Sequence, residues 1–138
     1  GVDGNAWSRR LLDSHPYSWL QMVSKVLADS VLDTEAVQGR GLVYATVDGE
    51  MMAGMNWDES ESVIDIVRTA REAEVAAVFK EVAADRWAVS LRSKTDVDVT
   101  PVAQALGGGG HMRAAGYSDS GTSAEVVGRL LAVLREMG

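Results

Sequence analysis

The clearest potential for chemistry in this sequence lies in four consecutive glycines followed by a histidine, Gly107 to His111. Glycine has no Cβ and adopts positive φ easily, so several backbone N–H groups of such a run can turn toward one concavity and bind an anion such as phosphate. The imidazole of His111 can donate to a phosphate, stack against a base, or hold the loop in shape. A long helix C-cap that runs into a turn is the alternative for the glycines. We expect a ligand-binding loop over Gly107–Gly116.

Two cations precede the glycines on a predicted strand. Between Arg86 and Lys94, apolar residues alternate with small or polar ones, which predicts a half-buried strand with Arg92 and Lys94 on the same face. Arginine presents a planar fork to phosphate and lysine a compact charge, so the pair favours a nucleotide-phosphate site. A solvated strand edge that carries protective charges is the alternative.

The motifs from Ser90-Leu91-Arg92-Ser93-Lys94, through Asp96-Val97-Asp98-Val99, to Gly107–Gly116 together resemble those of a known family. They are similar to the DHH-associated domain, the C-terminal half of DHH phosphoesterases, and most of all to its oligoribonuclease and 3′-phosphoadenosine-5′-phosphate phosphatase (nanoRNase) branch. The resemblance covers essentially the whole chain. It implies substrate-binding roles for Arg92, Ser93, Lys94, Gly108, Gly109, Gly110, His111 and Arg113.

The resemblance also implies a division of labour in a parent hydrolase. An N-terminal DHH domain would hold two divalent metals, Mn or Mg, and supply a metal-activated water, while the associated domain binds the nucleotide end of the substrate. Arg92 and Lys94 would contact phosphate or sugar, and His111 would recognise the nucleotide. The chain has only two histidines, His15 and His111, and no Asp-His-His run. We expect the chain alone to be inactive and to bind no metal or cofactor of its own.

The partners implied by the resemblance are nucleotides or short single-stranded RNA and the DHH domain of the same parent chain, and a homodimer of the parent is allowed. Two alternatives stay open: a non-enzymatic RNA-binding or assembly module, as in the related C-terminal region of alanyl-tRNA synthetases, and a RecJ-like single-strand exonuclease. The exonuclease would need a longer basic track than Arg92, Lys94 and Arg113 supply. The formal net charge of −7 argues against non-specific binding to long nucleic acids. Short RNA, a 3′,5′-bisphosphate nucleotide and linear or cyclic dinucleotides are equally compatible substrates.

Composition sets the scale of the fold. The 138 residues are 46% hydrophobic, enough for one core. No cysteine, no bilayer-length apolar run and no signal-like N-terminus occur in the sequence, so we expect a cytoplasmic protein with no membrane contact. Because the sequence starts at Gly1 without a methionine, we expect a piece of a longer protein.

These features must be positioned by an α/β domain with a mixed β-sheet flanked by helices. We expect residues 1–35 to form a helical linker from the missing DHH domain and residues 36–138 to form the substrate-binding domain. The periodicities predict strands over Gly41–Val47, Glu74–Ala83, Arg86–Lys94 and Ala115–Ser118. They predict helices over Asn5–Asp13, Pro16–Val31, Glu50–Asn56 and Val99–Leu106, and from Thr122 onward.

Several residues have a structural interpretation. Asp58 and Glu61 are expected to cap the helix that contains Val63 and Ile64, and Thr100 is expected to be the N-cap of its own helix. Asp96 and Asp98 are expected to accept hydrogen bonds in the loop after Lys94. The tryptophans are expected in the core or at an interface, namely Trp7, Trp19, Trp57 and Trp87.

Overall fold

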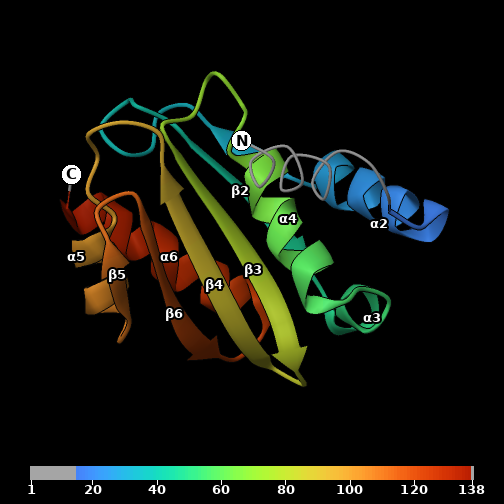
Figure 1. Ribbon diagram of the computed structural model, residues 1–138. Coiled ribbons are helices and arrows are strands. Elements are labelled where there is room, and N and C mark those ends of the chain that lie inside the picture. The colour runs from blue at the N-terminus through green and yellow to red at the C-terminus, as the bar shows by residue number, and fades with distance from the viewer. Residues whose placement is uncertain (1–14, 138) are drawn as a thin grey trace, which may run out of the picture.

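Six strands form one mixed sheet in the computed structural model, which describes residues 15–137, and helices lie on both of its faces (Figure 1). The sheet order is β1-β2-β3-β4-β6-β5, with β2 and β3 parallel and every other neighbouring pair antiparallel. The strands are β1 (Val31–Asp33), β2 (Leu42–Val47), β3 (Val75–Ala83), β4 (Arg86–Ser93), β5 (Gly109–His111) and β6 (Ala114–Ser120). The helices are α2 (Tyr17–Ala28), α3 (Gly49–Ala53), α4 (Trp57–Val67), α5 (Thr100–Ala105) and α6 (Ser123–Met137). The expected α/β fold is confirmed.

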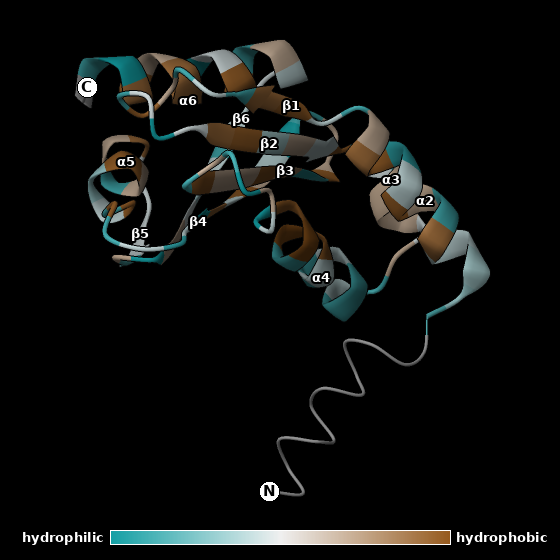
Figure 2. Ribbon diagram, turned by 90° about the horizontal axis from the view of Figure 1, so that it is seen from above, coloured by the Kyte–Doolittle hydropathy of each residue, from teal (hydrophilic) through white to brown (hydrophobic). Residues whose placement is uncertain are grey.

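Alternation along the strands divides the core into two layers. Odd-numbered residues of β3 and β4, such as Phe79 and Leu91, pack with Leu130 of α6 on one face. The even-numbered Val78 packs with Ile64 of α4 on the other face. Figure 2 shows the sheet between α6 on one side and α4 on the other. The apolar spacing of the sequence thus corresponds to two separate hydrophobic contacts of a single sheet.

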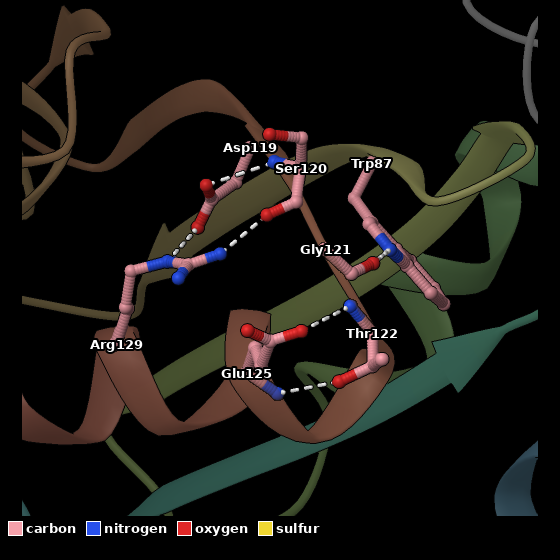
Figure 3. Close-up of polar contacts among 7 residues, drawn as sticks. All are labelled: Trp87, Asp119, Ser120, Gly121, Thr122, Glu125 and Arg129. Atoms are coloured by element: carbon pink, nitrogen blue, oxygen red, sulfur yellow. Dashed lines mark hydrogen bonds and ion pairs between the residues drawn. The ribbon is translucent and has the colours of Figure 1, made fainter.

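The start of α6 is fixed by the predicted capping box. The N–H of Thr122 donates to Glu125 Oε1 at 3.0 Å, and the N–H of Glu125 donates to Thr122 Oγ1 at 3.2 Å (Figure 3). These bonds satisfy two of the N–H groups that a helix start leaves unpaired. The pKa of Glu125 is lowered, chiefly by its hydrogen bonds with Thr122. The indole of Trp87 donates to Gly121 O at 2.9 Å, so β4 also holds this turn.

Several predicted helix boundaries are wrong, and one of them belongs to the segment Glu50–Asn56, which is helical over Gly49–Ala53. The N-cap of α4 is Asn56, which forms a capping box with Glu59. An N-cap side chain must accept from an N–H group of the first turn. Asp58 already lies inside that turn, so it cannot be the cap. Thr100 is the first residue of α5, and Asp98 accepts its N–H at 2.9 Å. The helix predicted to reach Val31 ends at Ala28 because the chain turns to pair β1 with β2. The helix expected over Asn5–Asp13 lies outside the described residues.

The tryptophans differ in their surroundings. Trp19 and Trp87 are buried, as predicted, whereas Trp57 is 61% exposed and is not a core residue. Trp57 is the first residue of α4, where the helix leaves its side chain beside the ammonium of Lys80, whose Nζ lies 4.9 Å from the ring centroid. Trp7 lies outside the described residues.

One face of the sheet is covered over only part of its width. Helix α4 packs on β2 and β3, whereas no helix lies in front of β4 and β6 on that side in Figure 1. The register places β4 and β6 side chains of this face opposite one another, and none of them is buried. Apart from two arginines, these side chains are small: Arg86, Ala88, Ser90 and Arg92 on β4, and Ala114, Gly116, Ser118 and Ser120 on β6. This face leaves room for a ligand or another domain.

Candidate phosphate-binding site

A concavity of about 430 Å³ lies at the end of the sheet where α4 and β4 end and β6 begins. Four of its lining residues are cations, and no carboxylate of residues 15–137 lines it. Arg92 and Lys94 lie at the end of β4 and just after it, and the antiparallel pairing of β4 with β6 brings Arg113 of the Met112-Arg113 turn to the same end. The lining residues are Arg68, Thr69, Arg92, Ser93, Lys94, Arg113 and Ala114.

Three of the cations are held by backbone carbonyls rather than by acids. Arg92 Nη1 donates to Leu91 O at 3.0 Å, and Arg113 Nε donates to Thr95 O at 3.0 Å. The ammonium of Lys94 donates to Ala70 O, just past the C-terminal end of α4. Within residues 15–137, none of the three forms an ion pair with a carboxylate. Each group has more N–H donors than the one bond uses, so the concavity can bind an anion without breaking an existing ion pair.

Ser93 is among the lining residues, but the alternation of β4 places its side chain with Leu91 on the face that α6 covers, not with Arg92. The residue is 5% exposed, and its Oγ has no hydrogen-bond partner among the described residues. Its backbone N–H donates to Arg113 O at 2.9 Å, which fixes the hairpin turn against the end of β4. Ser93 thus contributes through its backbone, which positions the turn that carries Arg113, while its hydroxyl is closed to solvent.

The first two glycines of the run end α5. Gly107 has φ +90°, its N–H donates to Gln104 O at 3.1 Å, and the N–H of Gly108 donates to Ala103 O at 2.8 Å. This pair of bonds is the Schellman motif, in which a left-handed residue satisfies the last helix carbonyls. The helix C-cap therefore accounts for the N–H of Gly108, and a ligand contact there must use another atom.

The expectation that Gly109–His111 lie in a loop is wrong, because these residues form β5 against β6. The reason is close backbone packing: a Cβ on Gly108 would lie 2.1 Å from Gly116 O, and one on Gly110 would lie 2.6 Å from Ala114 O. Gly109 differs, because a Cβ there meets nothing within 4 Å. Packing explains two of the glycines, and Gly109 has no such internal reason.

His111 is exposed on β5 and does not line the concavity. It pairs with Ala114, which pairs with Arg92, so the three residues form one cross-strand row. Neighbouring strands lie about 4.8 Å apart, which places the Cα atoms of His111 and Arg92 roughly 10 Å apart. The side chain between them is only a methyl group. The imidazole and the guanidinium thus border a shallow strip of the uncovered sheet face.

The structure therefore divides the predicted site residues into two adjoining groups. Arg92, Ser93, Lys94 and Arg113 line one concavity, while the glycines 108–110 and His111 belong to the neighbouring turn and strand. Sequence analysis missed Arg68 and Thr69, which lie 24 residues before Arg92 and Ser93 in the chain. No local motif marks them. Only the path from α4 through β3 to β4 brings them to the site.

The two acids near the cations have structural partners. Asp98 accepts from Thr100, as expected of a loop acceptor. Asp96 accepts from Thr95 Oγ1 at 2.9 Å and also pairs with Arg40, which precedes β2. The Arg40 hydrogen bond is the largest cause of the lowered pKa of Asp96, and the same bond raises the pKa of Arg40. Asp96 is thereby directed to Arg40 and leaves Arg92 and Lys94 without an acid.

The described residues contain neither a metal-binding cluster nor a membrane-spanning helix. Within residues 15–137, no group of three or more His, Asp or Glu side chains is arranged to hold a metal ion. No helix in the same range is long and apolar enough to cross a bilayer. The metals implied by the resemblance would therefore need ligands other than the described residues.

Comparison with known proteins identifies the class. Residues 39–137 match the DHHA1 domain family, so the chain belongs to that family. An exopolyphosphatase-related protein from Bacteroides fragilis has the same fold, with a TM-score of 0.80 at 18% identity over 96% of this chain and 38% of that one. This chain thus spans well under half of that protein. The pGpG-specific phosphodiesterase PggH from Vibrio cholerae matches with a TM-score of 0.56 at 12% identity, over 94% of this chain and 42% of its own.

A third similar structure comes from another kind of protein. The C-Ala domain of Aquifex aeolicus alanyl-tRNA synthetase matches with a TM-score of 0.51 at 17% identity, over 68% of this chain and 90% of that one. The fold is thus shared with a phosphodiesterase and with a domain of an aminoacyl-tRNA synthetase, and the fold alone does not separate the two. The chemistry of the concavity must do so.

Proposed function

We propose that this chain is the substrate-binding part of a DHH-family phosphoesterase, nearest the nanoRNase branch, that acts on short oligoribonucleotides or 3′-phosphoadenosine 5′-phosphate. The observation that supports the proposal is a concavity that the described part of the chain lines with four cations and no carboxylate, in a protein of net charge −7. A local cationic site on an acidic protein favours a small anionic end over a long backbone.

The residues of this chain would bind and orient the substrate rather than carry out bond chemistry. Arg92 and Arg113 would grip a phosphate with their planar forks, and Lys94 would add a compact charge. His111 and the strip over Ala114 would receive the adjoining sugar or base. A DHH domain in the parent, with Mn or Mg, would supply the hydrolytic chemistry, so holding the phosphate in line is the contribution of this chain.

The test is an NMR titration of the 138-residue chain with 3′-phosphoadenosine 5′-phosphate. Saturable shifts of the backbone amides of Arg92, Lys94 and Arg113 are expected. Arg92→Gln should weaken binding at least tenfold, since a charged hydrogen bond contributes about 1.5–3 kcal/mol. Arg86→Gln, at the other end of the same strand, removes an equal charge and should leave the affinity unchanged.

Two results would contradict the proposal. One is equal loss of affinity in Arg92→Gln and Arg86→Gln, which would indicate non-specific charge attraction. The other is binding of a structured tRNA with no response to the nucleotide, which would favour the RNA-binding or assembly module instead.

A further inference from the structure

Arg68 and Thr69 form one wall of the concavity, and they come from the C-terminal end of α4. Arg68 caps that helix and is exposed, with its Nε 3.8 Å from Asp65 Oδ1 one turn earlier. A cation at a helix C-terminus and an i,i+3 ion pair are both mildly stabilising, so a purely structural role of Arg68 would be to stabilise the end of α4. Its position opposite Arg92 and Arg113 in one concavity is not explained by that role.

The charge in the concavity exceeds what one phosphodiester needs. Four cations line it, and one of them, Arg68, is paired with Asp65. A phosphodiester carries one negative charge, whereas a terminal phosphomonoester carries between one and a half and two near pH 7, and it presents three oxygens. Four cations from three directions match the terminal group better.

The ion pair of Arg68 can be exchanged. Its two side chains are 51% and 41% exposed, and exposed pairs contribute little free energy. The helix C-terminus itself disfavours an anion, but the ammonium of Lys94 already occupies the carbonyl of Ala70 and offsets that field. A phosphate in the concavity can therefore take Arg68 from Asp65 at small cost.

We propose that Arg68 is a further phosphate-binding residue and gives the site its preference for a nucleotide end that carries a phosphomonoester. This inference rests on the proposed function and adds the chemical form of the substrate end. Asp65 then acts as the competing acceptor that holds Arg68 when no ligand is bound.

The experiment compares the affinities of the full chain for the 5′-phosphorylated diadenylate pApA and for its unphosphorylated form ApA. Arg68→Gln should weaken pApA binding about fivefold or more and leave ApA binding unchanged. Asp65→Asn should tighten pApA binding, because Arg68 loses its competing partner. Arg135→Gln, an exposed cation near the end of α6, removes the same charge and should change neither affinity.

The outcomes separate this inference from the proposed function. If Arg92→Gln weakens pApA binding and Arg68→Gln does not, the role of Arg68 is refuted and the proposed site survives. If neither variant matters, the proposed site fails as well. If Asp65→Asn weakens pApA binding as much as Arg68→Gln does, the pair only terminates the helix, and melting temperatures lowered equally in both variants would support that conclusion.

Discussion

At the scale of single residues, the positions of the glycine run differ in whether packing within the fold requires glycine. Gly108 lacks space for a Cβ, since Gly116 O would lie 2.1 Å from it, whereas Gly109 has open space. Glycine is thus required at 108 by packing against β6. At 109 a ligand or another domain that approaches the backbone is the remaining physical reason.

Gly108→Ala should destabilise the fold by about 1 to 3 kcal/mol, the usual cost of forcing a methyl group into a packed site. Urea unfolding followed by tryptophan fluorescence measures the difference. The control is Gly128→Ala in α6, where a Cβ meets nothing within 4 Å and a helix interior gains up to about 1 kcal/mol from alanine. Equal stability of the Gly108 variant and the parent would show that β5 can move away from β6.

Gly109→Ala is expected to leave urea stability within about 0.5 kcal/mol of the parent, the range of neutral surface changes, and to weaken nucleotide binding. The affinity for 3′-phosphoadenosine 5′-phosphate, measured by calorimetry, is the readout. His111→Ala should behave in the same way, because its side chain is exposed. Unchanged affinity in both variants would restrict the site to the concavity.

At the scale of elements, helix starts depend on which residue can reach back to the free N–H groups. Asn56 Oδ1 accepts from Glu59 N at 2.8 Å, and Glu59 Oε1 accepts from Asn56 N at 3.0 Å. The sequence offers several acids and amides in this segment, and only the path of the chain into α4 selects Asn56.

Asn56→Ala should lower stability by about 1 kcal/mol, the typical cost of a lost N-cap. Thermal unfolding checks the value. Asp58→Ala is the matched comparison, since Asp58 lies in the first turn without a capping bond, and its loss should cost only the few tenths of a kcal/mol of a charge near the helix start. If Asp58→Ala lowered stability more than Asn56→Ala, Asp58 would be the N-cap, as the sequence predicted.

The loop before β2 and the loop after β4 are joined by Arg40 and Asp96. Because the pKa of Asp96 is lowered below 3.8 in the folded state, its stabilising contribution is present above that value and is lost as the pH falls through the lowered pKa. Asp96→Asn should therefore be less stable than the parent at pH 7, with the difference vanishing in strong acid. Urea unfolding at pH 7 and near pH 2 tests this, and a difference independent of pH would contradict it.

How far the sequence predicts the structure varies with the range of the interaction. The β3–β4 hairpin, the alternation in β4 and the Thr122 cap follow from residues close together in the chain, and all are confirmed. Strand β5 was missed because a glycine-rich segment has no strand propensity, and its pairing depends on backbone packing against β6. Arg68 was missed because its neighbours in the site lie beyond an intervening strand. The ligand-binding roles of the site residues stay predictions.

At the scale of the whole molecule, the acidic surface and the cationic concavity should act together. The slope of log K against log salt should be the same for pApA and for an RNA of about 20 nucleotides, because only the end of either ligand contacts the cations. For single strands this slope changes by about −0.7 for each contacted phosphate. Fluorescence anisotropy over a range of salt measures both slopes. A steeper slope for the longer RNA would reveal a basic track and favour the RecJ-like alternative.

The two hairpins of the sheet turn on two residues each, Ala84-Asp85 and Met112-Arg113, yet they differ in what depends on their length. The first turn joins strands whose exposed ends carry nothing of the site. The second turn sets the alignment of His111 with Ala114, and one added residue there would send the imidazole to the opposite face of the sheet. Homologous domains should therefore tolerate insertions at the first turn, whereas the second turn should keep its length wherever the ligand is the same.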